Sequence, residues 1–534
     1  DAPLLAPATP ILNPITEDDT ANPGQTVASF IGSTVSDVDS GAATGIAITA
    51  TNDGNGHWQY STDGGTTWTT VSGLNGSNGL LLADTDKIRF VPNAENTTSP
   101  TFSYRAWDRT VGTAGSLATI GATGSTSAYS TDQNTASIAV GAVNDAPVLA
   151  VGDTTLSTLT EDATGNTGHL VSDLRGATTD ADAGAVQGLA ITSLASGNGH
   201  WQYSTDGGTT WTNADAGGAV SATHALLLRD TDHIRFVPNG ENATTASFDY
   251  RAWDQTGGTA GGYADTSANG GTTAFSSQQN AMDITVTAVN DAPLLAPATP
   301  ILNPITEDDT ANPGQTVASF RGAIADVDSG TQPGIVITGT TDGNGHWEYR
   351  IAGGSWTAFG SVSPTAAIAL ADSDRIRFVP NAENATSASL SYRAWDGTGV
   401  TAGSGVNASS TGNATPFSAA SDTATIAVSA VNDAPVLAAG DSTLTSINED
   451  DTANAGQLVS ALRGATTDAD SGAVQGVAIT GLDAGNGSWQ YSTDGGTSWH
   501  TVSGVSASNA LLLADSDRIR FVPNAENATS ASLS

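Results

Sequence analysis

Cysteine is absent from the 534-residue sequence, which excludes disulfide bonds, thiolate zinc sites and cysteine nucleophiles. Basic residues are scarce, because 16 Lys and Arg stand against 54 Asp and Glu, and Lys87 is the only lysine. No basic stripe is available to neutralise phosphates, so we expect no nucleic-acid partner. Long apolar runs are also missing, and no stretch approaches the roughly 20 residues of a membrane-spanning helix, so we expect no membrane insertion.

What is present is a long and strongly acidic chain. Its formal net charge is -38, so its carboxylates offer binding positions to hard cations, above all calcium. The length exceeds what one hydrophobic core covers, and several domains are expected. The sequence has no serine in a nucleophile elbow, no HExxH and no phosphate-binding glycine loop after a strand. We therefore expect a protein that is not an enzyme.

Internal repeats dominate the sequence. The string DAP[LV]LA begins at Asp1, Asp145, Asp291 and Asp433, and residues 1–30 recur unchanged as 291–320. The second and fourth copies resemble each other more closely, so the copies alternate as A-B-A-B. We predict one module per copy, with these bounds: 1–144 (repeat 1, type A), 145–290 (repeat 2, type B), 291–432 (repeat 3, type A) and 433–534 (repeat 4, type B, truncated). Because the sequence opens inside a motif and repeat 4 stops before YRAWD, we expect it to be a piece of a longer protein.

The local pattern predicts strands. Short runs rich in β-branched and aromatic residues recur in each repeat, as in residues 25–32 (QTVASFIG), 45–51, 57–61 and 87–92 of repeat 1. Clusters of Gly, Asn, Asp and Pro between them suit tight turns. About seven strands per repeat predict an all-β fold, a tandem array of immunoglobulin-like β-sandwich modules. The Gly-, Ser- and Thr-rich stretch 109–133 is interpreted as a long exposed loop or flap.

Acidic motifs recur at equivalent places of the repeats. Repeat 1 carries TEDD at 16–19, DVDSG at 37–41 and AWD ending at Asp108, and VND follows at 143–145. In these motifs the sequence resembles cadherin-like repeats, and TED followed by DVDSG is similar to the bacterial VCBS-type repeats of large surface proteins. The resemblance implies cadherin-like sandwiches with calcium at each junction. Its ligands would be a glutamate of one repeat, an Asn-Asp linker, and the DxD and AxD motifs of the next.

Carried over by position, this resemblance assigns a ligand set to each junction. The first set is Glu17, Asn144, Asp145, Asp180, Asp182 and Asp254. The second set is Glu161, Asn290, Asp291, Asp326, Asp328 and Asp396. The third set is Glu307, Asn432, Asp433, Asp468 and Asp470. The chemistry agrees, because calcium takes roughly six to eight oxygen ligands. Ala142, Ala288 and Ala430 replace the leading aspartate of the cadherin linker, so fewer ions per junction should bind. The alternative is that these residues only form Asx-turns.

A second motif matches the sialidase Asp-box. It reads STDGGTTW at 61–68 and 204–211 and STDGGTSW at 492–499, whereas repeat 3 has only RIAGGSW at 350–356. Asp-boxes are hairpin turns, and the sequence lacks the arginine cluster of a sialidase, so we interpret the motif as structural. Asn-x-Ser/Thr sequons follow each VPN, on a predicted loop, at Asn96, Asn242, Asn384 and Asn527.

Together these features favour the extended region of a large secreted bacterial surface protein, similar to adhesins of the repeats-in-toxin type. Its expected role is structural or adhesive, with calcium stiffening the junctions between neighbouring modules. Its expected location is extracellular, at the cell surface. The main alternative is a self-assembling subunit of an extracellular filament, sheath or surface layer, in which other copies of the protein are partners. Surface glycans remain open as a partner, and an Asp-box glycoside hydrolase is the third reading.

Overall fold

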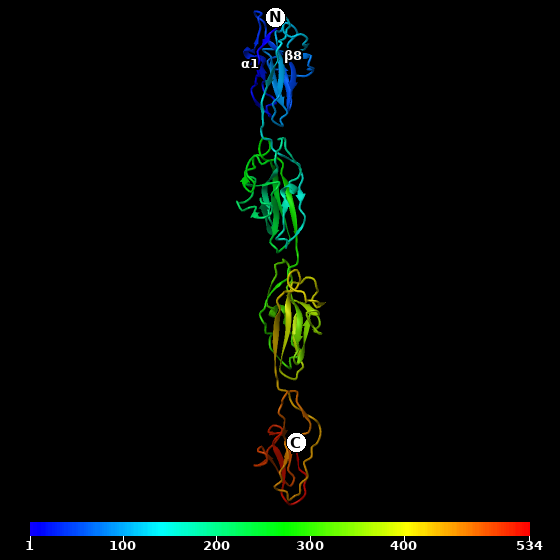
Figure 1. Cartoon of the computed structure of the whole chain (residues 1–534). Helices are drawn as coiled ribbons and strands as arrows, with labels where there is room; N and C mark the ends of the chain where they lie inside the picture. Colours follow the sequence, from blue (N-terminus) through cyan, green and yellow to red (C-terminus); the bar gives the residue numbers. More distant parts are fainter. The chain divides into compact units, whose positions relative to one another are not determined.

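The computed structural model describes residues 1–534, and the chain divides into two compact units, Asp1–Val289 and Asn290–Ser534. Strands and turns make up almost all of both units (Figure 1), and the helices are single short turns. None of these helices has the length and apolar character needed to cross a membrane. The all-β fold class predicted from the sequence is confirmed.

Repeat 1 is built from two main sheets. In spatial order the larger sheet contains β11 (Leu117–Thr119), β8 (Asn78–Ala83), β5 (Gly45–Asn52), β10 (Thr101–Trp107) and β12 (Asn134–Ser137). The smaller sheet contains β3 (Gln25–Thr26), β9 (Lys87–Pro92), β6 (Gly56–Ser61) and β7 (Thr69–Thr70). The strands of both sheets run antiparallel to their partners.

A shared core joins these two sheets into a sandwich. Strand β9 alternates half-buried and buried side chains, which directs Ile88 and Phe90 inward, as period-two alternation predicts. Trp58 of β6 meets Phe102 of β10 edge-to-face, with 4.8 Å between their ring centroids. Trp58 is only 1% exposed, so this aromatic contact lies at the centre of the core.

The first and last strands of repeat 1 position its acidic residues. Strand β2 (Ile15–Thr16) pairs parallel with β13 (Val140–Gly141), and β1 (Leu4–Leu5) pairs antiparallel with β4 (Val35–Ser36). Glu17 directly follows β2, so the parallel pair holds it beside the chain that leaves repeat 1.

Residues 25–32 differ from the predicted strand. Only β3 is extended, and Val27–Ile31 form the short helix α1, followed by η1 (Gly32–Thr34). The physical reason is the apolar spacing, because Val27 and Ile31 lie four residues apart and one helical turn buries both. The backbone N–H of Val27 also donates to the carbonyl of Asp86 in the turn between β8 and β9 (2.8 Å).

The stretch 109–133 is largely exposed, as predicted, but it is not only a loop. Its residues Leu117–Thr119 form β11, which pairs with β8. Ala128 and Tyr129 are buried against Trp107 and Leu81 in a second small core on the outer side of the larger sheet. Trp107 needs this cover because its ring would otherwise lie in water.

Repeat 2 has the same plan. Its larger sheet contains β15 (Thr154–Thr155), β16 (Leu159–Thr160), β26 (Asn280–Thr287), β24 (Thr244–Trp253), β19 (Gly188–Ala195), β22 (Ala225–Arg229) and β25 (Tyr263–Ala264). Its smaller sheet contains β17 (His169–Leu170), β23 (His233–Pro238), β20 (Gly199–Ser204) and β21 (Thr212–Asn213). The remaining elements are β14 (Val148–Leu149), β18 (Thr178–Thr179) and the short helix α2 (Val171–Leu174).

The second unit repeats the plan. The larger sheet of repeat 3 contains β28 (Ile305–Thr306), β38 (Asp422–Ser429), β36 (Thr386–Trp395), β31 (Gly334–Thr341), β34 (Ala367–Ala371) and β37 (Gly405–Val406). The smaller sheet contains β29 (Gln315–Thr316), β35 (Arg375–Pro380), β32 (Gly345–Arg350) and β33 (Thr357–Ala358). The other elements are β27 (Leu294–Ala296), β30 (Ala323–Ala325) and α3 (Val317–Phe320).

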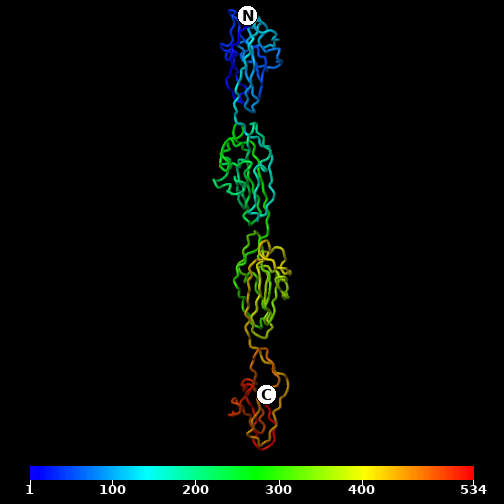
Figure 2. The backbone as a smooth tube through the Cα atoms, in the orientation of Figure 1, coloured from blue at the N-terminus to red at the C-terminus, as the bar shows by residue number.

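Repeat 4 keeps the smaller sheet, made of β40 (Gln457–Leu458), β47 (Arg518–Pro523), β44 (Gly487–Ser492) and β45 (His500–Thr501). Its other strands form two-stranded pairs: β39 (Val436–Leu437) with β41 (Thr466–Thr467), β42 (Gly476–Ile479) with β46 (Leu511–Ala514), and β43 (Leu482–Asp483) with β48 (Ser532–Leu533). One short helix, η2 (Val459–Ala461), follows β40. The backbone trace places the C-terminus within this repeat (Figure 2).

Separate hydrophobic cores accompany the four repeats. The largest core cluster of each repeat draws only on residues of that repeat. Trp58, Trp201, Trp347 and Trp489 hold equivalent central positions, each at most 2% exposed. The division into four independently folding modules with the bounds given above stays a prediction.

Candidate metal centre

The candidate centre in the first unit begins with Glu17, whose side chain is fully buried. Its backbone N–H donates to the carbonyl of Gly141 (3.0 Å), continuing the parallel ladder of β2 and β13. Its Oε1 accepts the N–H of Val143 (2.7 Å), while Oε2 has no hydrogen-bond partner. A buried carboxylate with an unused oxygen is costly unless a cation or donor approaches it.

The Asn-Asp linker is tied to repeat 2. The side-chain amide of Asn144 donates to Oδ2 of Asp254 (2.9 Å) and to the carbonyl of Thr273 (3.2 Å). The backbone N–H of Asp145 donates to Oδ2 of Asp182 (2.8 Å). These bonds bring the linker, the DxD motif and the AxD motif to one place.

The DxD motif forms a tight turn. The N–H of Asp182 donates to Oδ1 of Asp180 (3.0 Å), whereas Oδ2 of Asp180 is buried without a partner. Asp254 differs, because its Oδ1 already accepts two bonds from Thr256 and its Oδ2 accepts Asn144. Asp254 therefore orients the linker, and its oxygens are less available to a cation than those of Asp180.

Three carboxylates converge at this point. Glu17, Asp145 and Asp182 each offer an oxygen, and these oxygens all lie within 4.8 Å of one another. Oδ2 of Asp145, like Oε2 of Glu17, is buried without a hydrogen-bond partner. None of the ion pairs of the first unit involves these groups. The carboxylates therefore repel one another unless a cation lies between them.

Burial first, and this repulsion second, raise the pKa values of two of the aspartates. Burial raises the pKa of Asp145 above its usual value, and the negative charges of Asp18, Asp182, Glu17 and Asp180 raise it further. Burial likewise raises the pKa of Asp180, a backbone hydrogen bond from Asp182 lowers it, and the charges of Asp182 and Asp254 raise it again. A bound cation would favour the ionised forms of both groups.

The second unit contains the same arrangement at the third predicted set. Oε1 of Glu307 accepts the N–H of Val431 (2.7 Å), the N–H of Asp433 donates to Oδ2 of Asp470 (2.8 Å), and the N–H of Asp470 donates to Oδ1 of Asp468 (3.0 Å). Oxygens of Glu307, Asp433 and Asp470 all lie within 4.8 Å of one another. Asn432 donates to the carbonyl of Asp433 (2.9 Å).

The second predicted set is divided between the two units. In the first unit, Glu161 is buried and its Oε1 accepts the N–H of Val289 (2.6 Å). The members in the second unit make the same hydrogen bonds as the first set. The side-chain amide of Asn290 donates to Asp396 (2.9 Å), the N–H of Asp291 donates to Asp328 (2.7 Å), and the N–H of Asp328 donates to Asp326 (2.9 Å).

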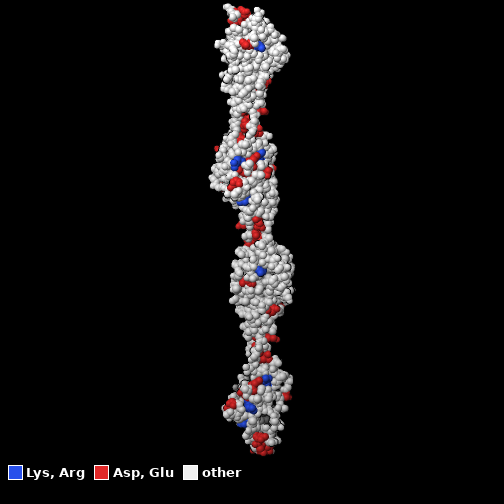
Figure 3. All heavy atoms as spheres, viewed as in Figure 1, with Lys and Arg blue, Asp and Glu red and all other residues white.

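Acidic side chains are conspicuous on the surface at this part of the first unit. Figure 3 shows them gathered where repeat 1 connects to repeat 2, while most of the surrounding surface carries no charge. An arrangement of buried and half-buried carboxylates with only oxygen donors is compatible with calcium.

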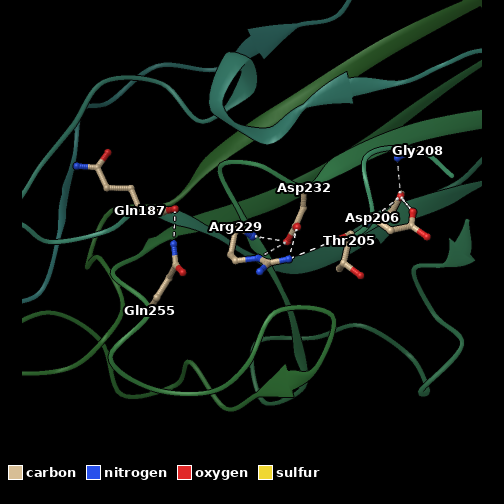
Figure 4. Close-up of polar contacts among 8 residues, drawn as sticks. Gln187, Thr205, Asp206, Gly208, Arg229, Asp232 and Gln255 are labelled. Carbon is tan, nitrogen blue, oxygen red and sulfur yellow. Dashed lines mark hydrogen bonds and ion pairs between the residues drawn. The ribbon is translucent and has the colours of Figure 1, made fainter. Parts of the chain in front are cut away.

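The Asp-box turns lie elsewhere and are held by their own bonds. Oδ1 of Asp206 accepts the N–H groups of Thr209 (3.1 Å) and Thr210 (2.9 Å), and Ser204 Oγ accepts the N–H of Gly208 (2.9 Å). Figure 4 shows Arg229 beside this turn, bonded to Asp232 and to the carbonyl of Thr205. Hydrogen bonds from Thr210 and Ser204 lower the pKa of Asp206 to about 2.

The recurring arginines of the IRFVPN strands have structural partners too. The guanidinium of Arg235 stacks over Trp211 of the Asp-box, 4.0 Å from the ring centroid, and donates to Gln202. Arg89 lies in the same way over Trp68, at 4.1 Å. Each arginine thus covers the tryptophan of its own repeat, and the set forms no carboxylate-binding cluster.

Three residues that contact or influence the candidate centre were not predicted as part of it from the sequence. Asp18, next to Glu17, contributes to the raised pKa of Asp145, and the TEDD motif already pointed to it. Thr256 occupies Oδ1 of Asp254, and no sequence motif marks this threonine. Asn96 is marked in the sequence only as a sequon, yet its side chain bonds to the DxD loop of repeat 2.

Comparisons with known proteins give distant likenesses only. The chain is similar to mouse protocadherin-24 EC1-3 at 12% identity and a TM-score of 0.33, covering 79% of this chain and 98% of that one. It is similar to Drosophila N-cadherin EC1-4 at 13% identity and a TM-score of 0.22, covering 98% of each chain. No protein-family model matches the sequence, and no curated protein matches it either. Likenesses with identities and TM-scores this low assign no function to this chain.

Proposed function

We propose that this chain is a calcium-stiffened extender region, with an adhesive or structural role, of a large secreted bacterial surface protein. Its four repeats act as separate sandwich modules, and the acidic residues between them hold calcium. The three ligand sets are those predicted from the sequence, with Glu17, Asp145, Asp180 and Asp182 as the main ligands of the first. Calcium and the neighbouring modules are the partners, and no catalytic step is assigned.

The observation that carries the proposal is the recurring group of one buried glutamate and two aspartates. Glu17, Asp145 and Asp182 come from two consecutive repeats, so one cation contacting all three links those repeats. The same group forms in the second unit, from Glu307, Asp433 and Asp470. Acidic turns without a metal role would not need a fully buried glutamate with an unused oxygen.

The donor set favours calcium over other metals. The groups consist of Glu and Asp without His or Cys, which disfavours zinc. Carboxylates from separate segments suit the variable geometry of calcium better than the strict octahedron of magnesium. Asp145 and Asp180 still have unused buried oxygens, so at least these atoms are available in addition to Glu17.

Calorimetric titration of the full chain with calcium tests this proposal. We expect binding with a dissociation constant of about 0.1 to 1 mM, the range of extracellular modules, and weaker binding of magnesium. Asp182→Asn and Asp470→Asn should each remove the heat of one junction, whereas Asp215→Asn, at an exposed aspartate outside the ligand sets, should remove none. Absence of binding heat at millimolar calcium would leave the acidic motifs as turn formers and overturn the proposal.

A further inference from the structure

We propose that Asn96 and Asn384 are clasps that hold the DxD loop of the following repeat in place, independently of bound metal. This inference deepens the proposed function and rests on the junctions serving as rigid joints. It concerns residues outside the predicted ligand sets, which the sequence marks only as sequons.

The contact in the first unit consists of two hydrogen bonds. Oδ1 of Asn96 accepts the backbone N–H of Ala183 (2.7 Å), and its Nδ2 donates to the backbone carbonyl of Ala181 (3.2 Å). The amide thus bonds to the backbone on both sides of Asp182. Asp182 in turn accepts the N–H of Asp145 and belongs to the acidic group.

The second unit repeats this contact with the same geometry. Oδ1 of Asn384 accepts the N–H of Ser471 (2.7 Å), and Nδ2 donates to the carbonyl of Ala469 (3.3 Å). These atoms flank Asp470, the counterpart of Asp182. Because Ser471 stands where repeat 2 has Ala183 and the contact persists, the clasp depends on backbone atoms of its partner only.

Asparagine is suited to this place for a chemical reason. A side-chain amide has an oxygen that accepts and an NH2 group that donates in one plane, so it can bond both the N–H of Ala183 and the carbonyl of Ala181. Aspartate would keep the acceptor but lose the donor, and it would add charge beside a loop that is already acidic. A neutral clasp joins the repeats without adding to the repulsion among the carboxylates.

The clasp and the cation act on different atoms of the same loop. The cation would contact the carboxylate of Asp182, whereas Asn96 holds the peptide groups around it. The clasp therefore lowers the conformational freedom that the loop would lose on binding a cation, which is a positioning role.

Hydrogen exchange of the full chain, followed by mass spectrometry in chelator, tests the clasp. Asn96→Ala should speed exchange in the segment 180–187 about tenfold and leave 468–475 unchanged, because one loop loses its two bonds. Asn384→Ala should do the reverse, so each variant is the control for the other. Asn93 lies in the same loop as Asn96, but its side chain bonds to Glu95 of its own repeat. Asn93→Ala should therefore change exchange in neither segment.

A second measurement separates the clasp from the metal site. Asn96→Asp keeps the acceptor for Ala183, so exchange in 180–187 should lie between that of the wild type and Asn96→Ala. Calcium should still bind to Asn96→Ala, with lower affinity at the first junction only. Unchanged exchange in both Asn96 variants would overturn the clasp, even if calcium binds as proposed. If exchange in 180–187 is slower in the wild type than in Asn96→Ala but no calcium binds, the clasp holds and the proposed function is overturned.

Discussion

Replacing Glu17 by glutamine should remove calcium-dependent stability while leaving the calcium-free protein intact. The amide of the Glu17→Gln variant would keep an oxygen acceptor for the N–H of Val143, the bond that Glu17 makes at 2.7 Å. The variant would lose the charge that repels Asp145, so in chelator we expect it to be as stable as the wild type or slightly more stable.

The magnitude follows from binding linkage. An ion that binds only the folded state at tenfold excess over its dissociation constant adds about 1.4 kcal/mol to stability. The wild type should gain about this amount at the first junction when calcium is added, and Glu17→Gln should lose most of the gain. Differential scanning calorimetry of the full chain, with calcium and with chelator, measures both quantities.

Glu95→Gln is the matched control, because it makes the same chemical change at an exposed glutamate of the same repeat. Glu95→Gln should shift no unfolding transition, either with calcium or with chelator. If Glu17→Gln destabilised the protein equally in chelator and in calcium, Glu17 would have only a structural role, and the reasoning from its unused oxygen would be refuted.

Two pH effects and two substitutions test other parts of the same structure. Calcium affinity should fall in acid, because protonation of Asp145 and Asp180, whose pKa values are raised, competes with the cation; titrations at several pH values check this. In the calcium-free protein acid should instead increase the stability of the folded state. Asp145 and Asp180 favour the folded state below the pKa values they have in the unfolded chain, and this contribution is lost as the pH rises through their raised pKa values in the folded state. Asp206→Ala should speed amide exchange in the segment 204–211 and leave the other Asp-box turns unchanged, and a sialidase activity lost in this variant would contradict the structural role. Tyr129→Ala should destabilise repeat 1 by about 2 to 4 kcal/mol and shift Trp107 fluorescence to the red, and an unchanged spectrum would show that the stretch 109–133 does not cover the ring.

Much of the fold was predictable from the sequence because period-two alternation and turn residues directly reflect sheet geometry. The strand β9 illustrates this, since its KIRFVP pattern alternates half-buried and buried side chains. The helix α1 was missed because β-branched composition was given more weight than the i, i+4 spacing of Val27 and Ile31. The strand β11 was missed because its Leu-Ala-Thr sequence is short and lies in low-complexity sequence.

The acidic site was predictable only through the resemblance in its motifs. The carboxylates lie far apart in the sequence, as Glu17 and Asp182 do, and only the parallel pairing of β2 with β13 explains why Glu17 meets the linker. The Asn96 contact had no such signal, because an asparagine that bonds to backbone atoms requires no particular side chain in its partner.

The most direct test of the central claim is a distance measurement across the first junction. Because the chain has no cysteine, Thr70→Cys in β7 and Thr212→Cys in β21, both exposed, place two spin labels at defined positions of the full chain. Double electron–electron resonance should give a narrow distance distribution at millimolar calcium and a broader one in chelator, and Asp182→Asn should remove the difference. Identical distributions with calcium and with chelator would contradict the claim that calcium stiffens the junction.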